Sequence, residues 1–164
     1  MKSPISKTQF QHIVYDFSQK NGRVFPWRQT EDPYHILVSE LMLQQTQTHR
    51  VVPKYEAFLK KFPTVESLAK ASLSEVLLLW TGLGYNRRAK YLHLLAQEVV
   101  VKHHGVVPKT SSELDALPGI GIYTAGAICA FAYNQKAVFI ETNIRTVFLH
   151  HFFPDEENIS DATL

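Results

Sequence analysis

The spacing of apolar residues constrains the fold of this chain more than any other feature. Phe10, Ile13, Val14 and Phe17 stand at i, i+3, i+4 and i+7, which is the spacing of one buried face on a helix. Similar helical patterns, interrupted by glycines and prolines, follow along the rest of the chain. No segment shows sustained strand alternation, and the nearest candidate, KAVFI (136–140), is short. We therefore expect an all-α protein.

Capping residues, prolines and glycines set the expected helix boundaries. Ser72 and Glu75 form a capping box, and Pro33 stands where a first helical turn accepts proline. Ser111 or Ser112 should cap a short helix that ends near residue 117. The expected helices cover residues 8–20, 33–46, 51–62 (entered at Pro53), 64–70, 72–80, 86–104, 111–117, 123–133 and 139–151, the last starting near Thr142 or Asn143.

Composition excludes several classes of protein. With 164 residues and 45% hydrophobic content, the chain can bury one core, or one domain and part of another. A net charge of +2 permits an anionic partner without requiring one. Cys129 is the only cysteine, so we expect no disulfide and no cysteine-ligated metal, and a reducing compartment. Neither a secretory segment nor a membrane span is expected, because no suitable apolar run occurs.

The stretch LPGIGIYTAGA (117–127) places two glycines at a turn between two expected helices. Gly119 and Gly121 permit positive φ, and the next helix would present free N–H groups to a phosphate. A bare Gly-x-Gly is more often a structural turn. The preceding Leu-Pro and following Thr-Ala-Gly make this pattern more specific. It predicts a helix-hairpin-helix at about residues 112–128 that grips a DNA backbone without reading sequence.

Five segments together resemble the helix-hairpin-helix DNA glycosylase superfamily, and within it the adenine DNA glycosylase (MutY-type) branch. The segments are FPWR (25–28), PYHILVSELMLQQTQ (33–47), FPTVESLAKASLSEVLLLWTGLGY (62–85), RRAKYLH (87–93) and LPGIGIYTAGAI (117–128). Their order and spacing fit throughout, over roughly residues 10–150. The SELMLQQTQ and GLGY segments are specific to this branch.

The resemblance implies a six-helix barrel domain and an incomplete second helical domain. The barrel, including the hairpin, would cover residues 25–133. The N-terminal helix (1–24) and residues 134–164 would belong to the second domain. Ser160-Asp161 resembles the N-cap of a further helix, so the chain is expected to stop within that domain.

Glu40 is the first candidate catalytic residue. A carboxylate in an apolar helix is costly unless it is paired or its pKa is raised, and a raised pKa keeps a proton available for acid catalysis. From the residues alone, a solvent-facing Glu40 is equally acceptable. The resemblance favours catalysis, because the matching glutamate in adenine glycosylases protonates the departing purine and helps to place the attacking water.

The resemblance also implies substrate-binding residues. Gln45 matches a residue that intercalates into the base stack, and Tyr85 matches a second wedge beside the mismatch. Trp27 and Arg28 match residues that line the adenine pocket. Without the resemblance, the glutamines at 44, 45 and 47 would belong to a solvated face of the same helix, and Trp27 to the core. The expected substrate-binding set is Trp27, Arg28, Leu43, Gln44, Gln45 and Tyr85.

Tyr123 separates two chemistries within the superfamily. Lyase-type relatives, which resemble endonuclease III, carry a lysine at this position, and its amine attacks the sugar. A phenol cannot form that imine, so we expect a monofunctional glycosylase. A tyrosine here also fits thymine-mismatch glycosylases.

Glu141 departs from the family pattern. The family carries an aspartate here, in Asp-Gly-Asn-Val, and this carboxylate stabilises the cationic sugar of the transition state. The present chain has Glu-Thr-Asn-Ile, which keeps the charge and Asn143 but lengthens the acid by one methylene. Glu141 therefore either serves the same role, acts with altered strength, or only offsets the helix dipole. The expected catalytic set is Glu40, Tyr123, Glu141 and Asn143.

The remaining expectations concern DNA and cofactors. Gly119, Gly121, Thr124 and Arg87 should contact the DNA backbone. Other basic residues would line a DNA face or simply be solvated: Arg50, Lys54, Arg88, Lys90 and Arg145. The histidine pairs lack metal-site spacing. The family's [4Fe–4S] cluster lacks its cysteine ligands here, and the only metal expected is a monovalent cation at the hairpin.

The function implied is base-excision repair. We expect a monomeric, cytoplasmic (in a bacterium, nucleoid-associated) glycosylase that removes adenine opposite guanine or 8-oxoguanine in double-stranded DNA, without membrane association. A thymine-mismatch glycosylase is the nearest alternative. A catalytically weak or inactive DNA-binding module is the second alternative, and a helical scaffold without a DNA role is the third.

Overall fold

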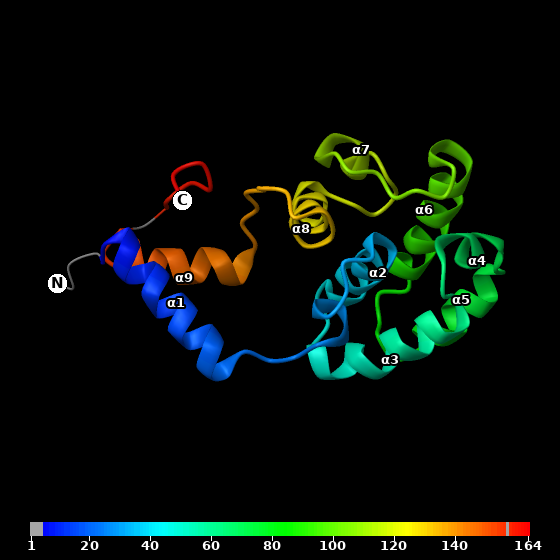
Figure 1. Ribbon diagram of the computed structural model, residues 1–164, viewed down its shortest axis with the longest axis horizontal. Coiled ribbons are helices and arrows are strands. Elements are labelled where there is room, and N and C mark those ends of the chain that lie inside the picture. The colour runs from blue at the N-terminus through cyan, green and yellow to red at the C-terminus, as the bar shows by residue number, and fades with distance from the viewer. Residues whose placement is uncertain (1–4, 157) are drawn as a thin grey trace. The chain divides into compact units, whose positions relative to one another are not determined.

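The computed structural model describes residues 5–156 and 158–164, and these residues form helices and turns but no strand. The all-α expectation is confirmed. The helices are α1 (Lys7–Asn21), the 3-10 helix η1 (Pro26–Arg28), α2 (Pro33–Leu43), α3 (Thr48–Lys61), α4 (Val65–Lys70), α5 (Leu73–Trp80), α6 (Arg87–His103), α7 (Ser111–Asp115), α8 (Ile122–Tyr133) and α9 (Thr142–Phe152) (Figure 1).

Side-chain caps begin several of these helices. The expected box at α5 is confirmed: the Glu75 amide donates to Ser72 Oγ at 3.2 Å, and the Ser72 amide donates to Glu75 Oε2 at 3.0 Å. Such a cap stabilises a helix by about 1 kcal/mol, because it satisfies orphan donors. The expected cap of α7 was wrong. Thr110 caps that helix instead of Ser111 or Ser112.

The segment between α2 and α3 differs most from expectation. Helix α2 ends at Leu43, so the expectation that Gln44 and Gln45 lie on this helix was wrong. Helix α3 begins at Thr48 and carries Pro53 in its interior, rather than starting there. Because Pro53 has no N–H, one bond of the helical ladder is absent. Because α2 ends at Leu43 and α3 begins at Thr48, residues 44–47 form a loop between the two helices.

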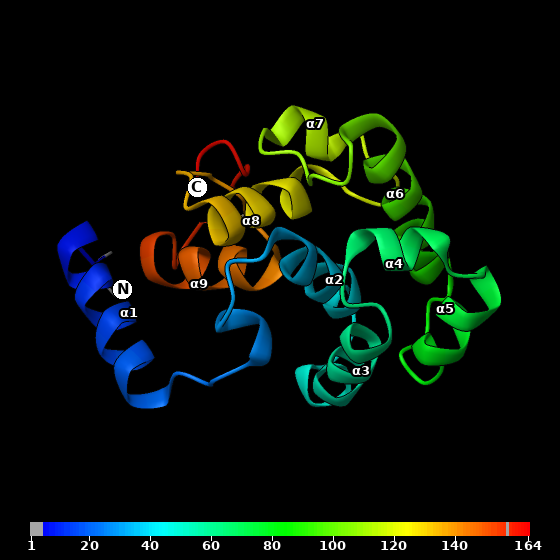
Figure 2. The same ribbon diagram turned by 45° about the vertical axis from the view of Figure 1, so that its right-hand side comes forward.

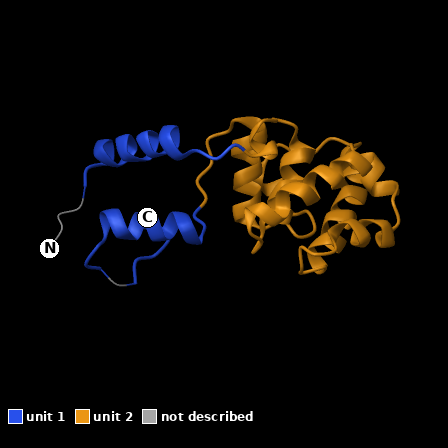
Figure 3. Ribbon diagram, turned by 90° about the horizontal axis from the view of Figure 1, so that it is seen from below, with its two compact units in different colours: residues 1–24, 140–164 blue, residues 25–139 orange. Residues whose placement is uncertain are grey.

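The chain divides into two compact units, coloured separately in Figure 3: Met1–Val24 with Ile140–Leu164, and Phe25–Phe139. In the larger unit, α2 packs against α3, α6 and α8, while α4 and α5 pack on α6 (Figure 2). Every buried side chain in the described part of the chain lies between Trp27 and Cys129. The larger unit thus holds the core, with α2 at its centre.

The smaller unit consists mainly of α1 and α9. Phe10 packs edge-on against Phe148, with ring centroids 5.3 Å apart, and against Phe152 at 4.9 Å. Neither helix has a buried residue. This unit therefore has aromatic contacts without an enclosed core.

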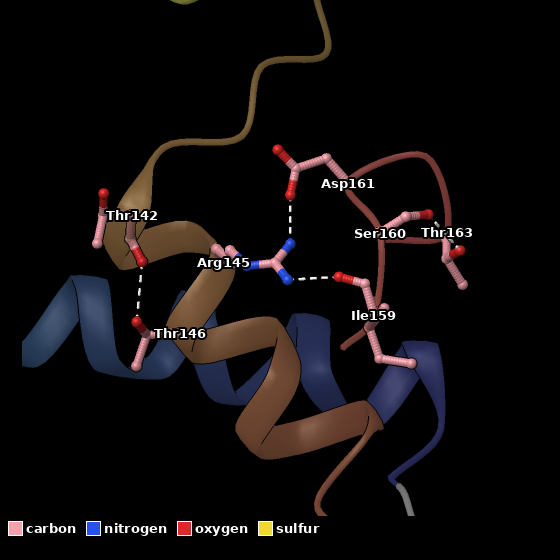
Figure 4. Close-up of polar contacts among 7 residues, drawn as sticks. All are labelled: Thr142, Arg145, Thr146, Ile159, Ser160, Asp161 and Thr163. Carbon is pink, nitrogen blue, oxygen red and sulfur yellow. Dashed lines mark hydrogen bonds and ion pairs between the residues drawn. The ribbon is translucent and has the colours of Figure 1, made fainter. Parts of the chain in front are cut away.

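Arg145 is used inside the smaller unit. Its guanidinium pairs with Asp161 and donates to the Ile159 carbonyl, which ties the last residues to α9 (Figure 4). Arg145, one of the basic residues that would line a DNA face or be solvated, thus has partners within its own unit. The expected C-terminal helix is represented by a turn, in which Ser160 O accepts from the Thr163 amide at 3.0 Å; residue 157, in the same segment, lies outside the described residues.

Candidate active site

Glu40 lies on the central helix of the larger unit. Its neighbours Leu37, Val38 and Leu41 are fully buried, and Glu40 itself is half-buried. Burial raises the pKa of its carboxyl group, and the nearby Arg28 guanidinium partly offsets this rise. The solvent-facing interpretation of Glu40 is therefore wrong. The carboxyl group is suited to hold a proton above the pH at which an ordinary glutamate loses it.

Arg28 is positioned by an aromatic ring from another helix. Its guanidinium carbon lies 3.8 Å from the ring centroid of Phe131 on α8. Such stacking contributes about 0.5–1 kcal/mol at exposed sites. Trp27, next in the chain, is buried and stacks on Phe25 with ring centroids 5.0 Å apart. The structure thus gives Trp27 a core role and leaves the Arg28 side chain exposed beside Glu40.

The two expected wedge residues project from loops. Gln45, in the loop after α2, has φ of 54°, and Tyr85, in the loop before α6, has φ of 50°. Both side chains are exposed, Tyr85 to 64%. Left-handed backbone is uncommon for residues other than glycine, and it clusters at functional sites.

Arg88 binds the loop after α2. One guanidinium nitrogen donates to the carbonyl oxygens of Leu41 at 2.8 Å and Met42 at 2.9 Å, and also to that of Gln44. These carbonyls stand at the C-terminal end of α2, where helices leave acceptors unsatisfied. The other nitrogen donates to Thr46 Oγ1 at 3.0 Å.

The same guanidinium binds the loop that carries Tyr85. It donates to the Gly84 carbonyl at 3.0 Å and to the Leu83 carbonyl at 3.4 Å. Arg88 is only 8% exposed. The expectation that it lines a DNA face was therefore wrong. Arg50, on α3, donates to the Gly82 carbonyl and so ties α3 to the loop before α6.

The sequence contained a signal for the position of Arg88. Arg88 stands at i, i+4, i+7 and i+11 with Leu92, Leu95 and Val99, all of which are buried on α6. An arginine that shares a helix face with buried apolar residues is itself expected to be buried. Phe131 gave no comparable signal, because its contact with Arg28 spans two distant segments.

The helix-hairpin-helix is formed by α7, the turn at 116–121 and α8. Gly119 has φ of 78°, and a Cβ at this position would lie 2.7 Å from Cβ of Tyr91. Gly121 is extended at φ of −117°, so of the two glycines that permit positive φ only Gly119 adopts it. Gly121 is the N-cap of α8 and provides no side-chain cap. The start of α8 is thus open to an anion.

Two further expected residues adjoin the hairpin. Arg87 donates from Nε to the hydroxyl of Tyr91 at 2.7 Å, and the Tyr91 side chain lies close to Gly119. Thr124 accepts from Gln44 Nε2 at 3.4 Å, which connects the hairpin helix to the loop after α2. The structure thus brings together Arg87 with the glycine turn and Gln44 with Thr124. Leu43 is half-buried against the core.

Tyr123 is the second residue of α8 and is 49% exposed. Its position at an open helix start leaves the phenol accessible from solvent. Glu141 and Asn143 belong to the smaller unit. Glu141 caps α9, because its Oε1 accepts from the Ile144 amide at 2.9 Å and its Oε2 from Asn143 Nδ2 at 3.2 Å. Glu141 therefore places its negative charge at the N-terminus of α9, where it offsets the helix dipole.

Within residues 5–156 and 158–164, no group of three or more His, Cys, Asp or Glu side chains is placed to share a metal ion. Cys129 is the only cysteine of the sequence, whereas a [4Fe–4S] cluster takes four thiolates. These residues therefore do not fit the cluster.

No helix among the described residues is long and apolar enough to span a membrane.

Helices α7 and α8, with the glycine turn between them, form a helix-hairpin-helix. The chain belongs to the HhH-GPD superfamily of base excision DNA repair proteins, whose family model matches residues 38–163.

Curated relatives agree with this assignment. An adenine DNA glycosylase of Mycobacterium tuberculosis is 44% identical over 130 residues, covering 79% of this chain and 43% of the relative. One from Buchnera aphidicola is 36% identical over 143 residues, covering 87% and 41%. The adenine DNA glycosylase of Homo sapiens is 40% identical, covering 85% and 27%. The chain thus spans less than half the length of these relatives.

Solved structures share the fold. A thermostable thymine-DNA glycosylase superposes with a TM-score of 0.78 at 32% identity, covering 87% of this chain and 69% of that one. Endonuclease III in a non-covalent complex with DNA superposes with a TM-score of 0.76, covering 93% and 73%. Its identity of 20% supports the fold alone.

Proposed function

We propose that this chain carries the active site of a DNA glycosylase that hydrolyses the N-glycosidic bond of adenine opposite guanine or 8-oxoguanine. The observation that carries this proposal is Glu40, a half-buried acid with a raised pKa on the central helix. General acids that protonate a leaving base need such a pKa. The curated relatives named adenine DNA glycosylase support adenine as the base.

Glu40 would act first as an acid and then as a base. Its carboxyl group donates a proton to a ring nitrogen of the adenine, while the bond between C1′ and the base breaks and its electron pair leaves with the base. The sugar is left as an oxocarbenium cation. Water then adds to C1′, and the Glu40 carboxylate accepts the proton that this water loses. The carboxyl group is thereby restored.

Glu141 would stabilise the cationic sugar by its negative charge, with Asn143 as its hydrogen-bond partner. Both carboxylate oxygens already accept hydrogen bonds, one from a backbone amide and one from Asn143. This anchoring supports a fixed orientation of the charge. A preorganised charge is more effective than a mobile one, because it needs no reorientation in the transition state.

The expected partner is double-stranded DNA, held by its backbone at the hairpin. The open N-terminus of α8, Gly121 and Thr124 would approach one phosphate, and the exposed Arg87 another. A monovalent cation at the hairpin would assist the same phosphate. Gln45 and Tyr85 would enter the base stack when the target nucleotide flips out. Tyr123 cannot form an imine, which supports base release without strand cleavage.

A panel of labelled duplexes tests this proposal. We expect release of adenine from A·G and A·8-oxoG duplexes, and strand scission only after alkali. Release of thymine from T·G with adenine retained would instead favour the alternative, which the 32% identical thymine-DNA glycosylase structure supports. Salt-dependent binding without release of any base would reduce the chain to a DNA-binding module.

A further inference from the structure

Arg88 is bound to parts of the chain that the sequence separates widely. Its six acceptors lie in two segments, residues 41–46 and 83–84, and no carboxylate among the described residues pairs with it. Burying a cation without a carboxylate partner costs desolvation free energy, and here only neutral oxygens compensate for that cost. Its Nε has no partner in the described structure.

Each of the two segments that Arg88 binds carries one of the five exposed non-glycine residues with left-handed backbone in the described part of the chain: Gln45 in one segment and Tyr85 in the other. Such a backbone is strained for a residue other than glycine and persists only when its surroundings fix it. Arg88 fixes both, because it binds the carbonyl before Gln45, the hydroxyl after it, and the carbonyl of Gly84 before Tyr85.

We propose that Arg88 is a positioning residue that holds Gln45 and Tyr85 as one rigid pair for insertion into mismatched duplex DNA. The insertion of Gln45 and Tyr85 into DNA, which is one part of this inference, rests on the proposed function. Arg88 does not contact the DNA itself. The planar guanidinium can reach both loops at once, whereas a lysine ammonium is a compact point donor that cannot span them.

The first test is amide hydrogen exchange in the free protein. The Thr46 amide donates to Leu43 O, and the Leu83 amide donates to Trp80 O, so each reports on one loop. In Arg88→Lys we expect both amides to exchange at least about tenfold faster. The matched control is Lys102→Met, which removes an exposed cation from the same helix and should leave both amides unchanged. Faster exchange in one loop alone, or in neither, overturns the proposal.

The second test compares DNA duplexes. For Arg88→Lys we expect the preference for an A·8-oxoG duplex over a matched duplex to fall by about 10-fold to 100-fold. Affinity for the matched duplex should stay unchanged, because the hairpin grips the backbone. Equal loss for both duplexes, or no loss, contradicts a positioning role.

A milder variant covers the case in which Arg88→Lys does not fold. Thr46→Val removes one acceptor of Arg88 while keeping the side-chain shape. We expect the same two amides to exchange faster, with a smaller loss of mismatch preference. If Thr46→Val changes neither, Arg88 serves folding alone and the proposal fails. The exchange result needs no DNA, so it is independent of whether the wild-type chain releases a base.

Discussion

Glu40 holds its proton to a higher pH than an ordinary carboxyl group, because burial on α2 disfavours its charged form. Arg28 works against this shift and is itself held by the Phe131 ring. The two opposite influences leave an acid that remains protonated above its usual range yet has a cation nearby to stabilise the carboxylate after proton transfer. A group that must act as acid and then as base needs both.

The raised pKa of Glu40 predicts a pH-dependent stability. The native state retains this proton at pH values where the unfolded chain has lost it, so the free energy of unfolding falls as pH rises from about 4.5 through the raised pKa. Glu40→Gln removes the titration. We expect its Tm to exceed that of the wild type at neutral pH. The difference should shrink as pH falls through the raised pKa towards 4.5, and below 4.5 both states hold the proton. A difference in Tm that does not change with pH would argue against a buried acid.

At the scale of elements, the two glycines of the hairpin have different structural roles. Gly119 needs its positive φ and its close approach to Tyr91, whereas a Cβ at Gly121 would have no described atom within 4 Å. The first glycine therefore shapes the turn. The second leaves the start of α8 without a side-chain cap, at the place where we propose that a phosphate binds.

We expect Gly119→Ala to lower the free energy of unfolding by about 2–4 kcal/mol, because left-handed strain and overpacking add. Gly121→Ala should cost under about 1 kcal/mol, the size of a weak N-cap change. It should nevertheless weaken DNA binding, because the new methyl group faces the phosphate. Chemical denaturation and a binding titration separate the two effects. Equal destabilisation by both substitutions would contradict the division of duties.

The positions of most helices could be predicted from the sequence, but the end of α2 could not. Local signals, such as Ser72 with Glu75, placed most helices, because a cap and an apolar stripe act within a few residues. The end of α2 was missed, because Arg88 captures the carbonyls of Leu41 and Met42 from more than 40 residues away. For the site, Glu40 was identified through the resemblance together with its apolar neighbours. The link through Arg88 depends on tertiary contacts that no local pattern contains.

At the scale of the whole molecule, the two compact units differ in what holds them together. Residues 25–139 contain the whole described core, whereas α1 and α9 bury no residue. Most stability of a domain comes from burial of apolar surface. Glu40, the proposed acid, therefore lies in the unit that holds the described core, and Glu141, the proposed cation stabiliser, in the unit whose helices bury no residue.

This difference predicts unequal hydrogen exchange. We expect amides in α1 and α9 to exchange at least about tenfold faster than those in α2 and α6, since local unfolding of a unit without a core costs less free energy. Exchange followed by mass spectrometry of peptides from each helix measures this. Equal protection in all four helices would show that the chain opens as a single cooperative unit.

Release of adenine is proposed to depend most on Glu40, which would act as the acid. The direct measurement is free adenine released from an A·8-oxoG duplex under single-turnover conditions by the wild type and by Glu40→Gln. We predict release by the wild type and a rate lower by about 10²–10⁴-fold in the variant, the range for loss of a general acid, with duplex affinity retained. Adenine release by Glu40→Gln at the wild-type rate would contradict the account.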